Sequence, residues 1–150
     1  MPGLSVKLPL SLDFQDGYAT NKSYNSLARQ NLKMLILTSP GERIMYPMFG
    51  VGIKGYLFNN YSKQTFSSIS ANIQSQAKRY LPYLRISNIE FDDGSADSSN
   101  ALIGNNMVII KISYIVTPTR SKSVLSLTIW YVNVNIFWYI LINKRGFKNV

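Results

Sequence analysis

The chain has 150 residues, 46% of them hydrophobic, which suits one folded domain and excludes a wholly disordered protein. It contains no cysteine and no histidine, so disulfide frameworks, zinc sites built from these residues, thiol nucleophiles and histidine-based catalytic triads are excluded. The 16 basic and 7 acidic residues give a formal net charge of +9, but no run of like charges marks a nucleic-acid-binding arm. We therefore expect a solvated basic surface, with an acidic protein or nucleic acid as the alternative partner.

The amino-terminal segment 4–12 alternates apolar and polar side chains, beginning with Leu4, Val6 and Leu8. A period of two residues predicts an extended strand with one apolar face. Pro9 lies within this segment and cannot donate a ladder hydrogen bond, so the strand is expected at a sheet edge or as a detached arm. Residues 13–21 are predicted to form a loop.

The next segment predicts an amphipathic helix that Ser23 caps and that ends near Leu37. Its apolar side chains recur at intervals of three and four residues, at Tyr24, Leu27, Ala28, Leu32, Leu35 and Ile36. The sequence Thr38-Ser39-Pro40-Gly41 ends the helix. Residues 42–50 are expected to be irregular or briefly extended, and residues 51–59 to form a short helix.

A second long helix is predicted over residues 62–81, with Ser62 as its cap and Pro82 as its end. Its core stripe consists of Phe66, Ile69, Ile73 and Ala77. Strands are predicted near 84–91, 106–117 and 124–129, separated by a polar hairpin loop at 94–104 and by Pro118. This order predicts an α+β fold of two layers, in which two long helices pack on a small antiparallel sheet, with an N-terminal extended arm.

Landmark residues in segment 31–59 resemble the baseplate wedge family of contractile phage tails, which has relatives in the type VI secretion baseplate. The segment reads as an apolar helix, then Thr-x-Pro-Gly-Glu-Arg, then Pro-x-Phe-Gly-x-Gly, then Leu-Phe. These landmarks are Thr38, Pro40, Gly41, Glu42, Arg43, Pro47, Phe49, Gly50, Gly52, Leu57 and Phe58. The helix ending at residues 79–82 and the terminal hairpin also fit, so the resemblance covers about residues 4–129.

The candidate interface is the bend around Glu42 and Arg43. In an extended backbone, adjacent side chains point to opposite faces, so each would be available to a different partner. The alternative is that each pairs with a surface charge of its own chain, which would contribute little stability. The resemblance implies docking onto the helical core bundle of neighbouring wedge proteins. The expected interface residues are Gly41, Glu42, Arg43, Pro47, Phe49 and Gly50, of which Phe49 is also expected to fill the core and Gly50 to allow a close approach or a positive φ.

The resemblance further implies a non-enzymatic virion component of the contractile tail baseplate, assembled in the host cytoplasm. It would provide the platform on which the tail sheath starts, by strand exchange with the sheath protein. No cofactor, metal, nucleic acid or small-molecule substrate is expected, and a membrane partner is disfavoured. The alternatives are a nucleic-acid-binding module and a baseplate-associated lysozyme. Against the lysozyme, Arg43 beside Glu42 favours a charged carboxylate, whereas a general acid must be protonated.

Residues 1–129 are assigned to the wedge domain, and residues 130–150 to an atypical apolar C-terminal extension. Both tryptophans, Trp130 and Trp138, lie in this extension, and alternation between residues 131 and 136 favours a further strand or an interface segment. The other interpretations are that the segment is translated beyond the position where the resembled family usually ends, or that it is a membrane anchor.

Overall fold

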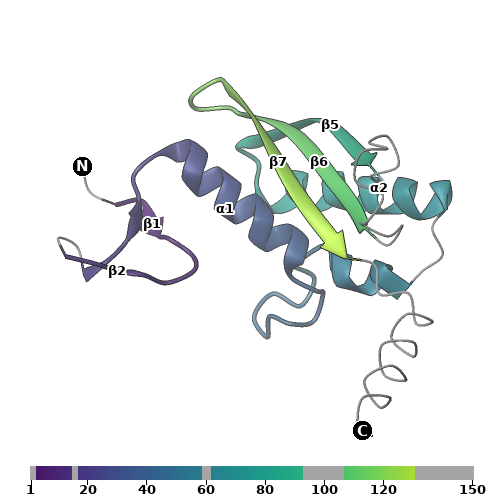
Figure 1. Ribbon diagram of the computed structural model, residues 1–150, viewed down its shortest axis with the longest axis horizontal. Helices are drawn as coiled ribbons and strands as arrows, with labels where there is room; N and C mark the ends of the chain where they lie inside the picture. Colours follow the sequence, from purple (N-terminus) through teal and green to yellow (C-terminus); the bar gives the residue numbers. More distant parts are fainter. Residues whose placement is uncertain (1–2, 15–16, 59–61, 93–106, 131–150) are drawn as a thin grey trace, which may run out of the picture.

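The computed structural model describes residues 3–14, 17–58, 62–92 and 107–130, and combines two α-helices with antiparallel strands (Figure 1). The elements in chain order are β1 (Ser5–Val6), β2 (Leu12–Asp13), β3 (Gly17–Tyr18), β4 (Thr20–Asn21), α1 (Tyr24–Leu37), the 3₁₀ helix η1 (Ile53–Phe58), α2 (Lys63–Tyr80), β5 (Leu84–Asp92), β6 (Met107–Val116) and β7 (Ser121–Trp130). The predicted mixture of helices and antiparallel strands is confirmed. The strands form three separate sheets rather than one.

Both α-helices begin at the predicted serine caps. The hydroxyl oxygen of Ser23 accepts a hydrogen bond from the Ser26 N–H at 3.2 Å, and that of Ser62 accepts one from the Thr65 N–H at 3.2 Å. Each bond satisfies a backbone donor that the first helical turn leaves without a partner. Beyond the caps, the apolar positions of each helix fall on one side, so both helices are held mainly by packing rather than by propensity.

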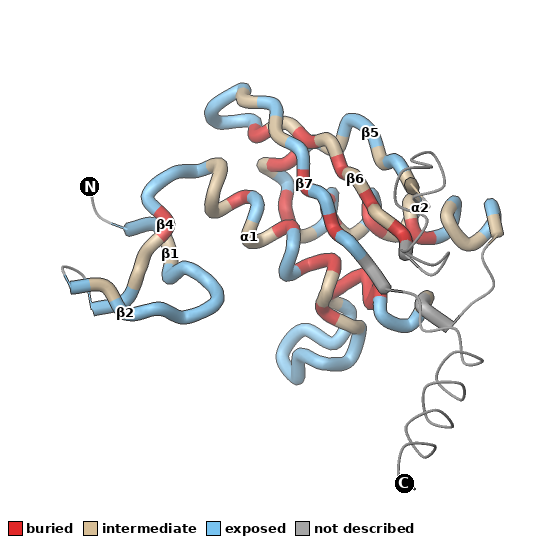
Figure 2. The backbone as a smooth tube through the Cα atoms, in the orientation of Figure 1, coloured by how far each residue is buried: buried red, intermediate tan, exposed pale blue. Residues whose placement is uncertain are grey.

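One hydrophobic core unites both helices with the three-stranded sheet β5–β6–β7 (Figure 2). The predicted stripe of α1 supplies Ala28, Leu32, Leu35 and Ile36. Tyr24 was expected in that stripe but is exposed, in the first turn of the helix. From α2 come Ile69, Ile73 and Ala77, and from β6 every second residue between Val108 and Val116. The central strand is therefore the most deeply buried part of the sheet.

Strand β5 keeps its apolar residues on the core side only because its register shifts between Ile86 and Asn88. Before this irregularity Leu84 and Ile86 pack on the core, and after it Ile89 and Phe91 do so. An extra residue in one strand changes which side chains face the core. The bulge at Ser87 explains why the apolar alternation in the sequence changes phase there.

The predicted strand at 4–12 and the predicted loop at 13–21 are both wrong in detail. Two short antiparallel pairs replace them, with Ser5 opposite Asn21 in β1–β4 and Leu12 opposite Tyr18 in β2–β3. The chain bends near Pro9 and folds back on itself, because the proline cannot continue a ladder. We call residues 3–14 and 17–22 the arm. It projects from the body of the molecule beside α1 (Figure 1), so an N-terminal arm is observed, but hydrogen bonds of Gln30 tie it to α1.

Two further predictions concern the ends of the sheet. Strand β7 begins at Ser121, three residues before the predicted start, because the turn at 117–120 is tight enough for pairing to resume at once. The hairpin loop at 94–104 and the extension beyond Trp130 lie outside the described residues. Among the helices that the structure does describe, none is both long and apolar enough to cross a membrane.

Tyr114 on β6 is the largest fully buried side chain of the core. Its hydroxyl oxygen has no hydrogen-bond partner of good geometry. Burial raises the pKa of the Tyr114 hydroxyl, and the nearby Ser123 side chain and the positive charge of Arg29 offset only part of this effect. An enclosed hydroxyl that makes no hydrogen bond costs free energy that a phenyl ring would not.

We expect Tyr114→Phe to raise the free energy of unfolding by about 1 kcal/mol at neutral pH, because the substitution removes this hydroxyl. The pKa of the Tyr114 hydroxyl in the folded state lies above the ordinary value of about 10, so the unfolded chain loses this proton at a lower pH than the folded chain does. The parent protein therefore loses stability as pH rises above about 10 toward the folded-state pKa, whereas phenylalanine does not ionise. The advantage of the variant should therefore widen above pH ~10. Urea denaturation of both proteins from neutral to alkaline pH measures it. A difference that stays constant with pH, or a less stable variant, would contradict this account.

A candidate docking loop

Residues 39–50, here the 39–50 loop, leave the end of α1 and return to the body through a series of tight turns. The Gly41 N–H donates to the Pro47 carbonyl at 2.7 Å and closes the loop across its base. Within it, the N–H groups of Tyr46 and Phe49 donate to the carbonyls three residues earlier, at 3.2 and 3.0 Å. The backbone at Glu42 is therefore bent. Residues 42–50 take the irregular form of the two that were expected, so the argument that sends Glu42 and Arg43 to opposite faces of an extended backbone does not apply.

Side chains of α2 hold the return of the loop. The Gln76 amide accepts from the Gly50 N–H at 3.3 Å and donates to the Met48 carbonyl at 3.2 Å, while the Asn72 amide donates to the Val51 carbonyl at 3.2 Å. On the α1 side, the Val51 N–H donates to the Leu35 carbonyl at 3.0 Å. The loop is thus tied to both helices, and its geometry is fixed by the body of the molecule.

Gly50 lies close against the backbone at the end of α1. Its φ is +113°, and a Cβ at this position would overlap the carbonyl oxygen of Thr38. Only glycine adopts this conformation without strain and leaves room for the neighbouring backbone. The expectation of a close approach with positive φ at Gly50 is confirmed. Gly41 also has a positive φ of +91°, but open space surrounds it.

The two charged residues of the bend have partners within the loop. The Glu42 carboxylate accepts a hydrogen bond from the Ser39 N–H at 3.0 Å. The Arg43 guanidinium lies over the Phe49 ring, 3.9 Å from its centroid. Among the described residues, neither side chain forms an ion pair, so the alternative that each pairs with a surface charge of its own chain is not observed. Arg43 keeps hydrogen-bond donors for a carboxylate, because stacking uses the face of the guanidinium and not its edges.

Phe49 packs against the core as expected and continues the stack. Its ring meets that of Tyr80 in an edge-to-face arrangement with centroids 5.0 Å apart, and the Arg79 guanidinium lies 5.4 Å from the Tyr80 centroid. Phe49 is thus both a core side chain and the support of Arg43. This places the predicted residues Gly41, Glu42, Arg43, Pro47, Phe49 and Gly50 in one loop, with Phe49 and Gly50 toward the body.

The tip of the loop carries an apolar surface that the sequence reasoning missed. Ile44 is 94% exposed and Met45 85%, and Tyr46 and Met48 are also exposed. The signal in the sequence was a run of large apolar residues in a segment that has no period of a helix or strand. Contiguous exposed apolar side chains on a fixed loop are typical of a contact surface.

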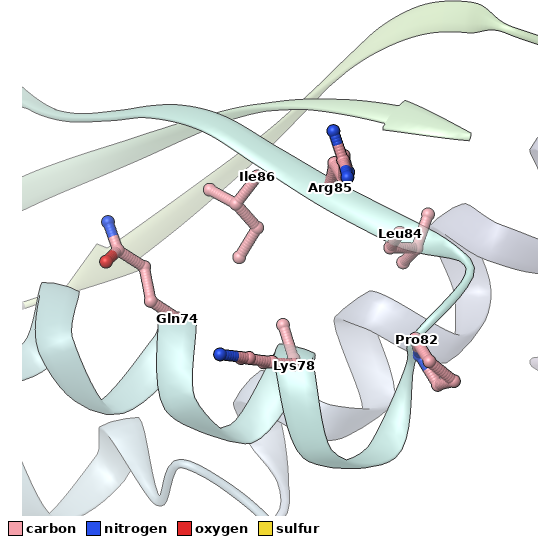
Figure 3. A pocket seen from close by; sticks show the side chains of 7 residues that line it. Gln74, Lys78, Pro82, Leu84, Arg85 and Ile86 are labelled. Carbon is pink, nitrogen blue, oxygen red and sulfur yellow. The ribbon is translucent and has the colours of Figure 1, made fainter. Parts of the chain in front are cut away.

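A hollow of about 580 Å³ lies between α2 and β5 (Figure 3). Figure 3 shows Ile86 pointing from β5 toward α2, whereas Arg85 extends from the other side of the strand. Gln74 and Lys78 border it from α2. Its lining combines aliphatic side chains with two cations and includes no carboxylate, so it does not offer the acidic pair of a glycosidase.

Two carboxylates, Glu90 and Asp92, line another hollow beside Lys63 and Lys111, and both are engaged by neighbouring side chains. Glu90 accepts from the Asn88 amide at 2.8 Å, and Asp92 pairs with Lys111 at 3.1 Å. Within residues 3–14, 17–58, 62–92 and 107–130, no three His, Cys, Asp or Glu side chains gather into a group that could hold a metal ion. The 39–50 loop is therefore the candidate site that the sequence and the geometry both indicate.

Comparison with known proteins decides the family. The family described as baseplate wedge protein gp25 matches residues 23–121, which extend from the cap of α1 to the start of β7 and include the 39–50 loop. The chain belongs to this family. It is accordingly a baseplate component, as the resemblance in the sequence implied. The arm lies outside the matched residues.

Two solved structures share the fold of this wedge-family chain. A protein from Geobacter sulfurreducens, described as a candidate tail lysozyme, has a TM-score of 0.60 at 20% identity and covers 75% of this chain and 95% of its own. A chain in the baseplate of the anti-feeding prophage has a TM-score of 0.58 at 19% identity and covers 75% of this chain and 83% of its own. No curated protein matches the sequence.

Replacing Gly50 should unfold the base of the loop in this wedge-family protein. We expect Gly50→Ala to lower the free energy of unfolding by at least about 2 kcal/mol, because the new Cβ meets the Thr38 carbonyl and the positive φ strains an L-residue. Gly41→Ala adds the backbone strain alone and should cost about 1 kcal/mol.

Gly55→Ala is the matched control, because Gly55 has neither a positive φ nor an atom within 4 Å of the added Cβ. It should change stability by no more than about 0.5 kcal/mol. Urea denaturation of the three variants checks this order, and equal losses at all three positions would contradict it.

Proposed function

We propose that this chain is a non-enzymatic subunit of a contractile-tail baseplate wedge, which docks on the helical core bundle of neighbouring wedge proteins through the 39–50 loop. The observation that carries this proposal is the combination of a fixed loop base with an exposed apolar tip. Because Gln76, Asn72 and Gly50 fix the loop before any partner binds, little conformational entropy is lost on docking. The family membership of the matched residues 23–121 supports a role in the baseplate.

Arg43 gives the docking loop its specificity. Its guanidinium rests on the Phe49 ring, beside the apolar tip. An arginine held in this way presents parallel N–H donors to a carboxylate, an arrangement that a lysine cannot reproduce. The partner surface would therefore combine an apolar groove for the tip with a carboxylate at the rim of the groove. Glu42 contributes by holding the turn through Ser39 rather than by meeting the partner.

The same protein would start the tail sheath through its sheet. Strands β5 and β7 each pair only with β6 in the described residues, so both outer edges of this sheet are open. An open edge presents backbone N–H and C=O groups that can pair with a strand of another protein. A sheath subunit that adds its strand here would be positioned for the first ring. The particle would contain this chain in the baseplate, after assembly in the host cytoplasm.

The alternative function is a baseplate-associated lysozyme, which the name of the Geobacter relative suggests. The relative is 20% identical, so the likeness concerns the fold. Glu42, the acidic residue of the 39–50 loop, lies on an exposed turn and accepts a backbone N–H. A retaining or inverting glycosidase needs two carboxyl groups on either side of one bond, and the acid must stay protonated. This arrangement favours a structural role for Glu42.

Polar substitutions at the tip should prevent docking without unfolding the protein. We expect Ile44→Ser together with Met45→Ser to reduce incorporation into purified tails by about tenfold or more, because both side chains lose apolar contact area in the interface. The free energy of unfolding should change by less than about 0.5 kcal/mol, because both residues are exposed. Complementation of a deletion mutant, followed by quantitative mass spectrometry of tails, measures incorporation.

Tyr24→Ser is the control for this test, because Tyr24 is an exposed large side chain on the opposite end of α1 from the loop. It should be incorporated normally.

The uncomplemented deletion mutant should make tail tubes without sheath in electron micrographs. Normal contractile tails in the deletion mutant, or full incorporation of the double variant, would contradict the proposal.

The Glu42→Gln variant distinguishes the lysozyme alternative from the structural role. It keeps an amide oxygen that can accept the Ser39 N–H, and it removes the ionisable carboxyl. We expect this variant to assemble normally and neither protein to clear peptidoglycan in a zymogram. Clearing by the parent chain that the substitution abolishes would establish catalysis and overturn the non-enzymatic assignment.

A further inference from the structure

Side-chain hydrogen bonds of Gln30 and Asn21, here called the clamp, attach the arm to α1. The Gln30 side-chain amide accepts from the Leu8 N–H at 3.0 Å and donates to the Val6 carbonyl at 3.0 Å. Asn21, which is 6% exposed, donates from its amide to the same Gln30 oxygen at 2.9 Å. The clamp satisfies the backbone of the arm as a neighbouring strand would. It therefore holds the arm at a fixed distance from the helix.

A groove of about 480 Å³ runs between the arm and α1. Its cations are Lys7 from the arm and Arg29 and Lys33 from α1, where a spacing of four residues places the last two on the same face. No acidic side chain lines the groove, and none of the three cations is paired with a carboxylate in the described residues. Leu8, Met34 and Leu37 add an aliphatic lining.

We propose that this arm–α1 groove binds an acidic segment of a partner protein, in which carboxylates alternate with aliphatic side chains. Like the net charge of +9, the three unpaired cations favour a negatively charged partner. The aliphatic lining favours a peptide that also buries apolar side chains. Leu10, Leu12 and Phe14 are also exposed on the same arm, so it offers a partner further apolar contact area.

The composition of the groove favours a protein over a nucleic acid. Sequence-independent binding of single strands relies on aromatic side chains that stack with bases, and the lining includes no aromatic residue. The apolar segment 131–150 of this chain is also disfavoured, because its only charged residues are Lys144, Arg145 and Lys148. The site is separate from the 39–50 loop and independent of the docking proposed for it.

The test uses the full chain and a short blocked peptide that alternates glutamate and leucine. Amide chemical shifts should change at Lys7, Leu8 and residues 26–37 on titration, and binding should weaken with added salt. Peptides with glutamine in place of glutamate, or serine in place of leucine, should bind at least about tenfold more weakly. Equal binding of either peptide would overturn the proposal, because it requires both the charge and the aliphatic side chains.

Charge reversal provides the matched variants. Arg29→Glu with Lys33→Glu should weaken peptide binding by about tenfold or more, whereas Lys78→Glu with Arg85→Glu, an equal change in charge at the α2–β5 hollow, should leave it unchanged. If both double variants lose peptide affinity to a similar extent, the effect comes from net charge in general, and the proposal that the groove binds the peptide is overturned. Tighter binding of an oligothymidylate than of the peptide would also overturn the proposal.

The double variant Ile44→Ser with Met45→Ser should bind the peptide normally. The proposal of peptide binding in the groove and the proposal of docking through the 39–50 loop can therefore fail independently.

Discussion

The contact on which the rest of the molecule depends is the close approach of Gly50 to the Thr38 carbonyl at the end of α1. The N–H of Gly52 donates to that same carbonyl at 2.9 Å, and the Thr38 hydroxyl donates to the Met34 carbonyl at 2.7 Å. Together with the bond from the Val51 N–H to the Leu35 carbonyl, these contacts give partners to the carbonyls of Met34, Leu35 and Thr38, which a helix end leaves without partners of its own. A side chain at position 50 would separate these segments and release both the loop and the chain that leads into η1.

Helix α1 links the two surfaces that are proposed to meet other proteins. Its final turn begins the 39–50 loop, while Gln30, near its middle, clamps the arm that lies beside its amino-terminal half (Figure 1). The buried side of the helix is fixed in the core by Leu32 and Ile36. Because one packed helix carries both attachments, their separation is set by the core. A partner that contacts the loop and one that contacts the arm would be held in a defined relation.

Much of the fold followed from local signals in the sequence. Serine caps and apolar periodicity located both α-helices, and the alternation from Val108 to Val116 identified the central strand with its buried face. The arm was harder to predict, because β1–β4 and β2–β3 are two-residue pairs whose partners are set by the clamp of Gln30 and Asn21. Such long-range side-chain hydrogen bonds leave no periodic pattern.

The candidate site was predicted in part, for a similar reason. Residue types at the bend identified the segment, and Gly50 was correctly expected to allow a close approach or a positive φ. The direction of the side chains could not be derived, because it depends on turns closed by Gly41 and Pro47 and on the stacking of Arg43 over Phe49. The exposure of Ile44 and Met45 is a property of the folded surface, since only the finished core shows which apolar residues it leaves outside.

The most direct measurement is a cryo-electron microscopy structure of the intact tail at a resolution that shows side chains. The account predicts that Ile44, Met45 and Tyr46 are buried against a neighbouring wedge protein, with the Arg43 guanidinium beside a carboxylate of that protein. A baseplate in which this loop faces solvent and touches no other subunit would contradict it.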